Sequence, residues 1–201
     1  MKIVVTQRID LHKSRNEYRD SLDQELIKLL VQLNHTPVPV PNSLVTSNED
    51  EKLIDWINNV KPTGLLISGG NDIGQYLNRD KTEETLYLWS LKNNFPILGI
   101  CRGMQLIGTL NGSKLKRVTN HLKIKHKIIN NSNGNMIIKN SFHSFSLSEC
   151  PKDFEITFFS TDNQIEGIKH IEKNINGIMW HPERGEKFME DDLNLIKNIF
   201  G

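Results

Sequence analysis

The first hundred residues alternate short apolar runs with stretches of helical spacing, and this alternation constrains the fold more than any other feature. The apolar runs are Lys2–Thr6, Gly64–Ile67 and Pro96–Ile100, each of a length typical of a buried strand. Strands that alternate with helices form βαβ units, in which a parallel sheet is covered by helices on both faces. We therefore expect an α/β three-layer sandwich with a mostly parallel, flavodoxin-like central sheet.

The stretches between these runs predict helices and one edge strand. Pro37–Pro41 has valines between prolines, and it is expected to form only a short or edge strand because proline lacks an N–H group. Glu17–Leu33 repeats leucine at helical spacing, and Ser47–Val60 begins with a capping serine and acidic residues. The expected helices are Glu17–Leu33, Ser47–Val60, Lys81–Asn93, Met104–Leu110 and Asp191–Phe200.

From Ser113 to Gly177 the chain changes to β-prone runs separated by Asn/Gly turns. This pattern predicts antiparallel strands added to the same sheet. The length of 201 residues suits one well-filled domain, so we expect residues 1–201 to form a single domain. The runs are Ile124–Ile129, Met136–Lys139, Glu155–Ser160 and Gln164–Ile171.

Composition excludes several classes of protein. The formal net charge is +1, so no overall field favours nucleic acid or anionic membranes. The N-terminal sequence MKIVVTQRID has too short an apolar run for a signal peptide, and no run is long enough for a membrane span. We expect a cytoplasmic protein in which the two cysteines, Cys101 and Cys150, are free thiols.

The sharpest local motif is the segment LGICRGMQ at residues 98–105, in which an apolar strand leads through Gly-x-Cys-x-Gly directly into a helix. It is the cysteine counterpart of the G-x-S-x-G nucleophile elbow. Such a turn places Cys101 at a helix N-terminus, where the dipole favours a thiolate, and directs the N–H of Arg102 toward a developing oxyanion. The alternative is an ordinary buried cysteine beside a strand-ending glycine.

Two other motifs supply partners for this cysteine. In the segment NGIMWHPE at 176–183, His181 and Glu183 are two residues apart at the end of a strand, so both can face one site as base and orienting carboxylate. A surface turn with a solvated Glu183 is the alternative. The segment SGGND at 68–72 follows a central strand, and its glycines let backbone N–H groups approach a ligand, unless it is an ordinary βα turn.

The three motifs stand in the order S-G-G-N-D, G-I-C-R-G-M-Q and W-H-P-E, and this order resembles the class I glutamine amidotransferase superfamily, in particular its γ-glutamyl hydrolase branch (peptidase family C26). Arg79-Asp80 before Glu83 and the segment NSFH at 140–143 also fall where that branch carries similar segments. Ser68 and Met179 depart from the commoner proline and glutamine of relatives, and neither departure removes a catalytic group.

The resemblance implies a mechanism and a set of site residues. Cys101 would attack a γ-glutamyl carbonyl, the N–H groups of Gly70 and Arg102 would form the oxyanion hole, and the histidine would transfer protons while the glutamate orients it. No cofactor is implied, and a metal site using Cys101 and histidines lacks a close ligand spacing such as CxxC. The implied residues are Cys101, His181 and Glu183 for catalysis, Gly70 and Arg102 for the oxyanion, and Gln105, Arg102, His143 and Gly69 for substrate binding.

The leaving group stays open at this point. Composition and short length resemble enzymes that release CDP-amidate from γ-glutamyl-CDP-amidate in bacterial capsule phosphoramidate synthesis, and this makes that compound the specific expected substrate. The basic residues Arg8, Lys13, Arg15 and Arg19 would then meet a nucleotide diphosphate, or else form a solvated basic face. Alternatives are hydrolysis of γ-glutamyl-GABA or similar amines, a glutaminase subunit that delivers ammonia to a synthetase, and a non-catalytic binding protein of the same fold. A small-molecule substrate is the expected partner, and a homodimer is compatible with the sequence.

Overall fold

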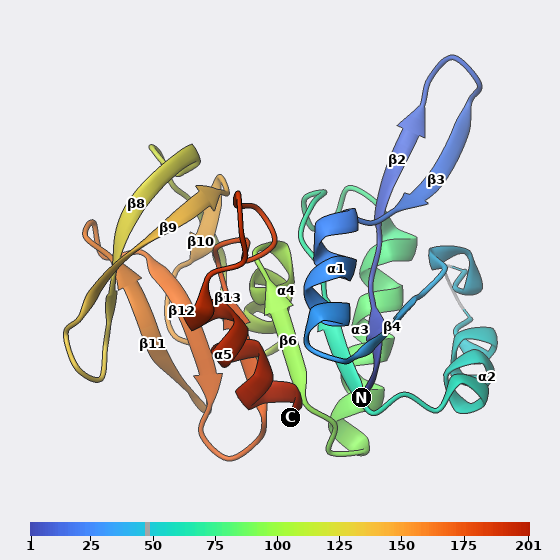
Figure 1. Cartoon of the computed structure of the whole chain (residues 1–201). Helices are drawn as coiled ribbons and strands as arrows, with labels where there is room; N and C mark the ends of the chain where they lie inside the picture. Colours follow the sequence, from blue (N-terminus) through green and yellow to red (C-terminus); the bar gives the residue numbers. More distant parts are fainter. Residues whose placement is uncertain (47–48) are drawn as a thin grey trace.

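One nine-stranded sheet forms the centre of the computed structural model, which describes residues 1–46 and 49–201. The strand order is β4-β1-β5-β6-β13-β12-β11-β8-β9 (Figure 1). All pairs from β4 to β13 are parallel, and all pairs from β13 to β9 are antiparallel. The strands are β1 (Lys2–Val5), β4 (Thr36–Pro39), β5 (Gly64–Ile67), β6 (Ile97–Ile100), β8 (Leu122–Asn130), β9 (Met136–Phe142), β11 (Phe154–Ser160), β12 (Ile165–His170) and β13 (Ile175–Ile178).

This arrangement confirms the predicted α/β fold. The parallel sheet comes mainly from the first half of the chain, and the antiparallel strands of the second half extend the same sheet. Proline-rich β4 lies at the edge, where a strand can lack N–H donors on one side.

Helices cover both faces of the sheet, and each face has its own apolar core. On one face, α2 (Glu51–Val60), α3 (Leu77–Lys92) and α4 (Arg102–Leu110) contribute buried side chains. On the other face, α1 (Gln24–Gln32) and α5 (Glu190–Phe200) do the same, as Figure 1 shows. A short 3-10 helix, η1 (Asn42–Leu44), follows β4.

The predicted helix at Glu17–Leu33 is wrong in its first part. Glu17–Ser21 is strand β3, which pairs with β2 (Arg8–His12) in an antiparallel hairpin that projects from the sheet in Figure 1. The sequence EYRDS has no apolar side chain at helical spacing, and its backbone bonds are made by β2 instead. The helix starts only after Asp23, whose side chain accepts a hydrogen bond from the backbone N–H of Glu25 as an N-cap residue does.

Smaller differences concern element ends. Helix α3 begins at Leu77 rather than Lys81, and β13 ends at Ile178, before Met179 and Trp180. The predicted capping residue Ser47 lies outside the described residues. Two short strands, β7 (Leu115–Arg117) and β10 (Phe145–Leu147), pair with each other and were not predicted. Among the described residues, no helix is both long and apolar enough to cross a membrane.

Candidate active site

Cys101 lies at the junction of β6 and α4, in the backbone conformation that a nucleophile elbow requires. Its φ of 52° and ψ of −106° place a non-glycine residue in a region that L-residues seldom adopt. Its N–H donates to the carbonyl of Ile178 at 2.7 Å, which continues the pairing of β6 with β13. The side chain is buried and free of a disulfide. Cys150, the other cysteine, is also a free thiol and is only partly buried.

The two glycines of Gly-x-Cys-x-Gly allow helix α4 to lie directly against the sheet. A Cβ atom added to Gly103 would lie 2.1 Å from the carbonyl oxygen of Ile67, and one added to Gly99 would lie 2.5 Å from the carbonyl carbon of Gly103. Neither distance is possible between non-bonded atoms. The glycine spacing therefore reflects close packing of helix and strand as well as the turn itself.

The structure brings His181 and Glu183 together beside Cys101. The Nδ1 atom of His181 lies 2.6 Å from Oε1 of Glu183, and both side chains are buried. A Cβ atom on Gly69 would lie 2.7 Å from Cε1 of His181 and 3.6 Å from Cβ of Cys101, so the three residues converge on one point. A surface turn with a solvated glutamate is thereby excluded.

The surroundings of His181 favour its charged form. Burial alone would lower its pKa, but hydrogen bonds to Cys101 and Glu183 outweigh burial and raise the pKa to about 9. At neutral pH the imidazole is therefore protonated. An imidazolium next to a cysteine sulfur stabilises the thiolate, which is the nucleophilic form.

Arg79 is a site residue to which the sequence assigned no role. Its guanidinium is fully buried and donates to the carbonyl oxygens of Ser68 (3.0 Å), Gly69 (2.9 Å) and Gly70. In a planar trans peptide the N–H points opposite to the preceding C=O. Because Arg79 binds the carbonyl oxygen of Gly69, the N–H of Gly70 in the same peptide points away from Arg79. The φ of Gly70 is +81°.

The side chain of Arg102 does not have the predicted substrate-contacting position. Its guanidinium is buried and pairs with Asp80 and Glu83 of α3. Glu83 also accepts hydrogen bonds from Arg79 (2.9 Å) and from the hydroxyl of Thr6 (2.8 Å). The side chain therefore links α4 to α3, because a buried guanidinium needs carboxylates around it, and only its main-chain N–H stays available for the predicted oxyanion role.

Gln105 and His143 both contact the carbonyl oxygen of Phe145. The amide of Gln105 donates to the carbonyl of Phe145 at 2.9 Å, next to His143. The ring of His143 is buried and directs Nε2 toward Glu166 at 3.5 Å. This imidazole therefore faces a second polar cluster, and the predicted substrate contact by His143 is not supported by its orientation.

A pocket of about 230 Å³ opens beside Gly69 and His181. Its other walls come from the β2–β3 hairpin, the start of α1 and the end of the His-Pro-Glu segment. Arg8 and Arg184 lie at its rim, with side-chain exposures of 46% and 34%, and each is near an acid of the lining: Arg8 is 2.7 Å from Asp10 and Arg184 is 3.8 Å from Glu183. The lining residues are Arg8, Asp10, Ser21, Leu22, Asp23, Leu26, Ser68, Gly69, Gly70, His181, Glu183 and Arg184.

Comparison with known proteins gives the family. A family model described as glutamine amidotransferase class-I matches residues 16–200. The chain belongs to this family. As a class I glutamine amidotransferase it is 32% identical to γ-glutamyl-CDP-amidate hydrolase of Campylobacter jejuni, with coverage of 98% of this chain and 94% of that protein.

Other members of the class I glutamine amidotransferase family are also similar. A glutamine-hydrolysing GMP synthase subunit of Methanococcus vannielii is 30% identical, over 73% of this chain and 76% of that protein. A glutamine amidotransferase structure from Thermotoga maritima superposes with a TM-score of 0.67 at 16% identity, and covers 98% of this chain and 82% of that one. The second likeness supports the fold alone.

Proposed function

We propose that this class I glutamine amidotransferase is a cysteine hydrolase of γ-glutamyl amides, with γ-glutamyl-CDP-amidate as its substrate, and that residues 1–201 act as one hydrolase domain. The observation that carries the proposal is the convergence of Cys101, His181 and Gly69. A strained cysteine at a helix N-terminus lies beside a histidine that a buried carboxylate holds at 2.6 Å. Nucleophile, base and orienting group are thus in mutual reach.

In the acylation step the sulfur of Cys101 attacks the γ-carbonyl carbon and forms a C–S bond. The negative charge that develops on the carbonyl oxygen is stabilised by the N–H groups of Gly70 and Arg102. Collapse of the tetrahedral intermediate breaks the C–N bond, and protonated His181 gives its proton to the leaving nitrogen. The products of this step are a γ-glutamyl thioester and the free amidate or amine.

In the deacylation step water attacks the thioester carbonyl. Neutral His181 takes a proton from this water, and Glu183 keeps the imidazole in the required orientation. The C–S bond breaks, glutamate leaves, and the sulfur is again a thiolate beside an imidazolium. Each proton taken by His181 in one step is returned in the other, so the pair is regenerated at each turnover.

The nature of the leaving group is suggested by the pocket and by the C. jejuni relative. A volume of about 230 Å³ accommodates a glutamyl group and leaves a nucleotide outside. A leaving group that extends out of the pocket would contact Arg8 of the β2–β3 hairpin and Arg184. Arginine suits diphosphate because its planar guanidinium forms paired hydrogen bonds with phosphate oxygens.

A glutaminase subunit is the second candidate, because the GMP synthase subunit of M. vannielii and the anthranilate synthase component 2 of Thermococcus kodakarensis are also similar to the chain. Such a protein would hydrolyse free glutamine and do so well only when its synthetase is bound. γ-Glutamyl-GABA and related amines form a third group of substrates. The three cases differ in the group attached to the γ-nitrogen, and this difference makes them separable in one assay.

The deciding experiment measures glutamate release from γ-glutamyl-CDP-amidate, glutamine and γ-glutamyl-GABA. We expect kcat/KM for the CDP-amidate compound to exceed that for glutamine by roughly 10²-fold or more. Glutamine lacks the nucleotide group, so contacts with that group cannot contribute to binding of the transition state. The Cys101→Ala variant should release no glutamate. Cys150→Ala is the matched control, since Cys150 is a free, half-buried thiol outside the proposed site.

Three results would overturn parts of the proposal. Full activity of Cys101→Ala would exclude covalent catalysis. A preference for γ-glutamyl-GABA would keep the hydrolase and change its substrate. Strong glutamine hydrolysis that depends on an added synthetase would replace the hydrolase by a glutaminase subunit.

A further inference from the structure

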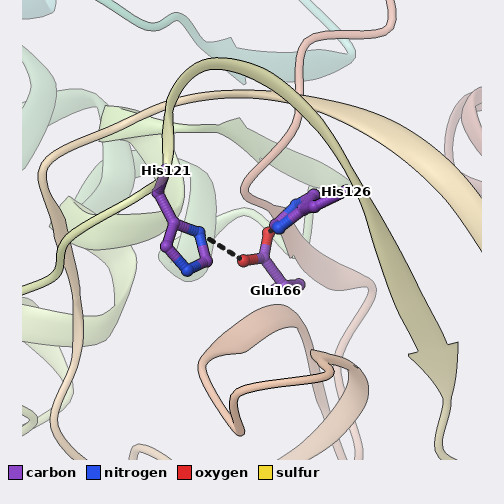
Figure 2. A group of neighbouring side chains, drawn as sticks. All are labelled: His121, His126 and Glu166. Atoms are coloured by element: carbon purple, nitrogen blue, oxygen red, sulfur yellow. Dashed lines mark ion pairs between the residues drawn. The ribbon is translucent and has the colours of Figure 1, made fainter.

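A second polar cluster lies in the antiparallel half of the molecule, apart from the pocket. Glu166 on β12 is fully buried, and its carboxylate faces His121, which directly precedes β8, and His126 on β8 (Figure 2). One ligand atom from each of the three residues lies within 4.8 Å of the other two. The proposed hydrolysis mechanism uses none of them.

The separations in this cluster are longer than those of strong hydrogen bonds. Oε1 of Glu166 lies 3.4 Å from Nδ1 of His121, and Oε2 lies 3.7 Å from Nε2 of His126. A histidinium–carboxylate bond should be about 2.7–2.9 Å long. Both oxygens and both nitrogens are buried without a hydrogen-bond partner among the described residues, a combination that carries a large penalty unless a proton or a metal cation is shared between them.

The same separations suit a metal ion. Ligand atoms about 2.0–2.1 Å from a tetrahedral Zn²⁺ lie roughly 3.3–3.4 Å from one another. The oxygen–nitrogen distances of 3.4 and 3.7 Å are close to this value. In sequence, His121 and His126 are separated by four residues, a local spacing that zinc-binding histidine pairs often have.

In two histidines next to Glu166, the ring nitrogen that faces away from Glu166 (the outer nitrogen) is held by a hydrogen-bond acceptor, as it is in metal-ligating histidines. Nε2 of His121 lies 3.0 Å from a carboxylate oxygen of Asp162. Nδ1 of His143 lies 3.0 Å from the carbonyl of Phe145, which can only accept a hydrogen bond. With the proton on the outer nitrogen, the inner nitrogen presents its lone pair to the centre of the cluster. The inner Nε2 of His143 lies 3.5 Å from Glu166 and, among the described residues, also has no hydrogen-bond partner.

We propose that His121, His126 and Glu166 bind one Zn²⁺ ion. Two imidazoles and one carboxylate form a ligand set that favours Zn²⁺ over Ca²⁺ or Mg²⁺. Water would complete the tetrahedral coordination of a metal ion held by these three side chains. This differs from the expectation from the sequence, which considered only histidines combined with Cys101 and assigned no metal.

The place of the site in the fold gives the metal a role. The ligands join β8 to β12, and His143, which lies 3.5 Å from Glu166, belongs to the link between β9 and β10. The main-chain carbonyl of Glu166 accepts from the N–H of Met179 at 2.8 Å, two residues before His181, and Phe145 accepts from Gln105. Bound Zn²⁺ would therefore hold in place two segments that reach the proposed active site. The role of the metal would be to position these segments.

The test is the metal content and thermal stability of the full chain prepared without a histidine tag. After dialysis against Zn²⁺ and removal of free metal, we expect about one Zn²⁺ per chain, a higher melting temperature with Zn²⁺ and a lower one after chelation. Binding of Co²⁺ instead should give the intense visible absorption of a tetrahedral site.

The variants distinguish the loss of a metal ligand from a general loss of side-chain packing. Glu166→Gln and His126→Gln should weaken Zn²⁺ binding by more than about 100-fold, and Asp162→Asn, which changes only the outer contact of His121, by about 10- to 100-fold. His12→Gln, an exposed histidine of the hairpin, is the control and should keep its metal. Glutamate release is not the readout, so failure of this site is distinguishable from failure of the proposed hydrolysis.

Two outcomes overturn the proposal. One is a wild-type chain that retains no Zn²⁺ and whose melting temperature does not respond to added metal. The other is a Glu166→Gln chain that binds Zn²⁺ as tightly as the wild type. If Glu166→Gln does not fold, His126→Gln and Asp162→Asn decide the question, because the side chain of Asp162 is 55% exposed and its change to asparagine keeps its shape.

Discussion

Cys101 combines an unfavourable backbone conformation with a favourable electrostatic position. A non-glycine residue at φ 52° costs on the order of 1–3 kcal/mol and persists only where its surroundings impose it. Here β6 and α4 impose it from both sides, since Gly99 and Gly103 let them pack at backbone contact. The strain places the sulfur at a helix N-terminus and beside His181, where a thiolate is stabilised.

The pH dependence of the proposed reaction follows from His181. Its pKa is raised to about 9 by Cys101 and Glu183 against the effect of burial, so the imidazole is protonated below that pH and loses its proton above it. Acylation uses this proton, so kcat/KM should fall as pH rises through about 9. A pH–rate profile of glutamate release would measure this limb.

Replacement of the orienting carboxylate tests the same assignment. Glu183→Gln removes the charged partner that lies 2.6 Å from Nδ1, so the alkaline limb should shift to lower pH and kcat should fall roughly 10²- to 10⁴-fold. Glu186→Gln, which changes an exposed glutamate three residues later, should leave both unchanged. An unshifted limb in Glu183→Gln would assign the alkaline limb to another group.

At the scale of elements, helix α3 does more than cover the sheet. Its first two turns carry Arg79, Asp80 and Glu83, which are joined to the glycine loop and to Arg102 of α4. The sequence predicts the helix from its polarity and spacing, but starts it four residues late and gives Arg79 no role. A charged side chain on a helix is normally solvated, and only the packed structure reveals that this one is fully buried.

Arg79 should affect the rate more than substrate binding. Arg79→Lys keeps the charge opposite Glu83 but cannot reach three carbonyls at once, so the Gly70 peptide loses its fixed direction. We expect kcat to fall roughly 10²- to 10³-fold, the range for loss of one oxyanion donor, with a smaller change in KM. Steady-state kinetics on the proposed substrate would measure both.

The control for this change is Lys81→Arg, an exchange of the same two residue types at a half-exposed position of the same helix. A melting curve distinguishes a misfolded Arg79→Lys chain from a folded one with a slow chemical step. A folded Arg79→Lys chain with wild-type kcat would show that the direction of the Gly70 N–H has no influence on the reaction.

At the scale of the molecule, the structures of the two halves of the chain could be predicted from the sequence to different degrees. Apolar runs and helical spacing in the first half predict most of the parallel strands and helices, because the buried positions of these strands are all apolar. The hairpin of β2 and β3 was missed because both strands are largely exposed and only Ile9 among their residues is buried. In the second half the long strands were predicted and the short strands β7 and β10 were missed. The meeting of His121, His126 and Glu166 depends on pairings between distant strands, which local patterns do not encode.

The antiparallel half also supports the proposed base through a single side chain. The amide of Asn140, on β9, accepts from the N–H of His181 at 2.8 Å and donates to the carbonyls of His181 at 2.7 Å and Arg184 at 2.9 Å. It therefore forms a bridge between the edge strand β9 and the His-Pro-Glu segment. The position of His181 depends on both halves of the chain.

Asn140→Asp tests this dependence with a side chain of the same shape. Aspartate keeps the oxygen that accepts from the His181 N–H, but it replaces the amide donor by a negatively charged oxygen. This oxygen would repel the carbonyl oxygens of His181 and Arg184, so the His-Pro-Glu segment should shift. We expect kcat to fall about 10- to 100-fold, since a displacement of about 1 Å at a catalytic group has that effect, with a lower melting temperature. Asn133→Asp, in the exposed turn between β8 and β9, is the matched control. Wild-type kcat in a folded Asn140→Asp chain would mean that His181 is held by the parallel half and Glu183 alone.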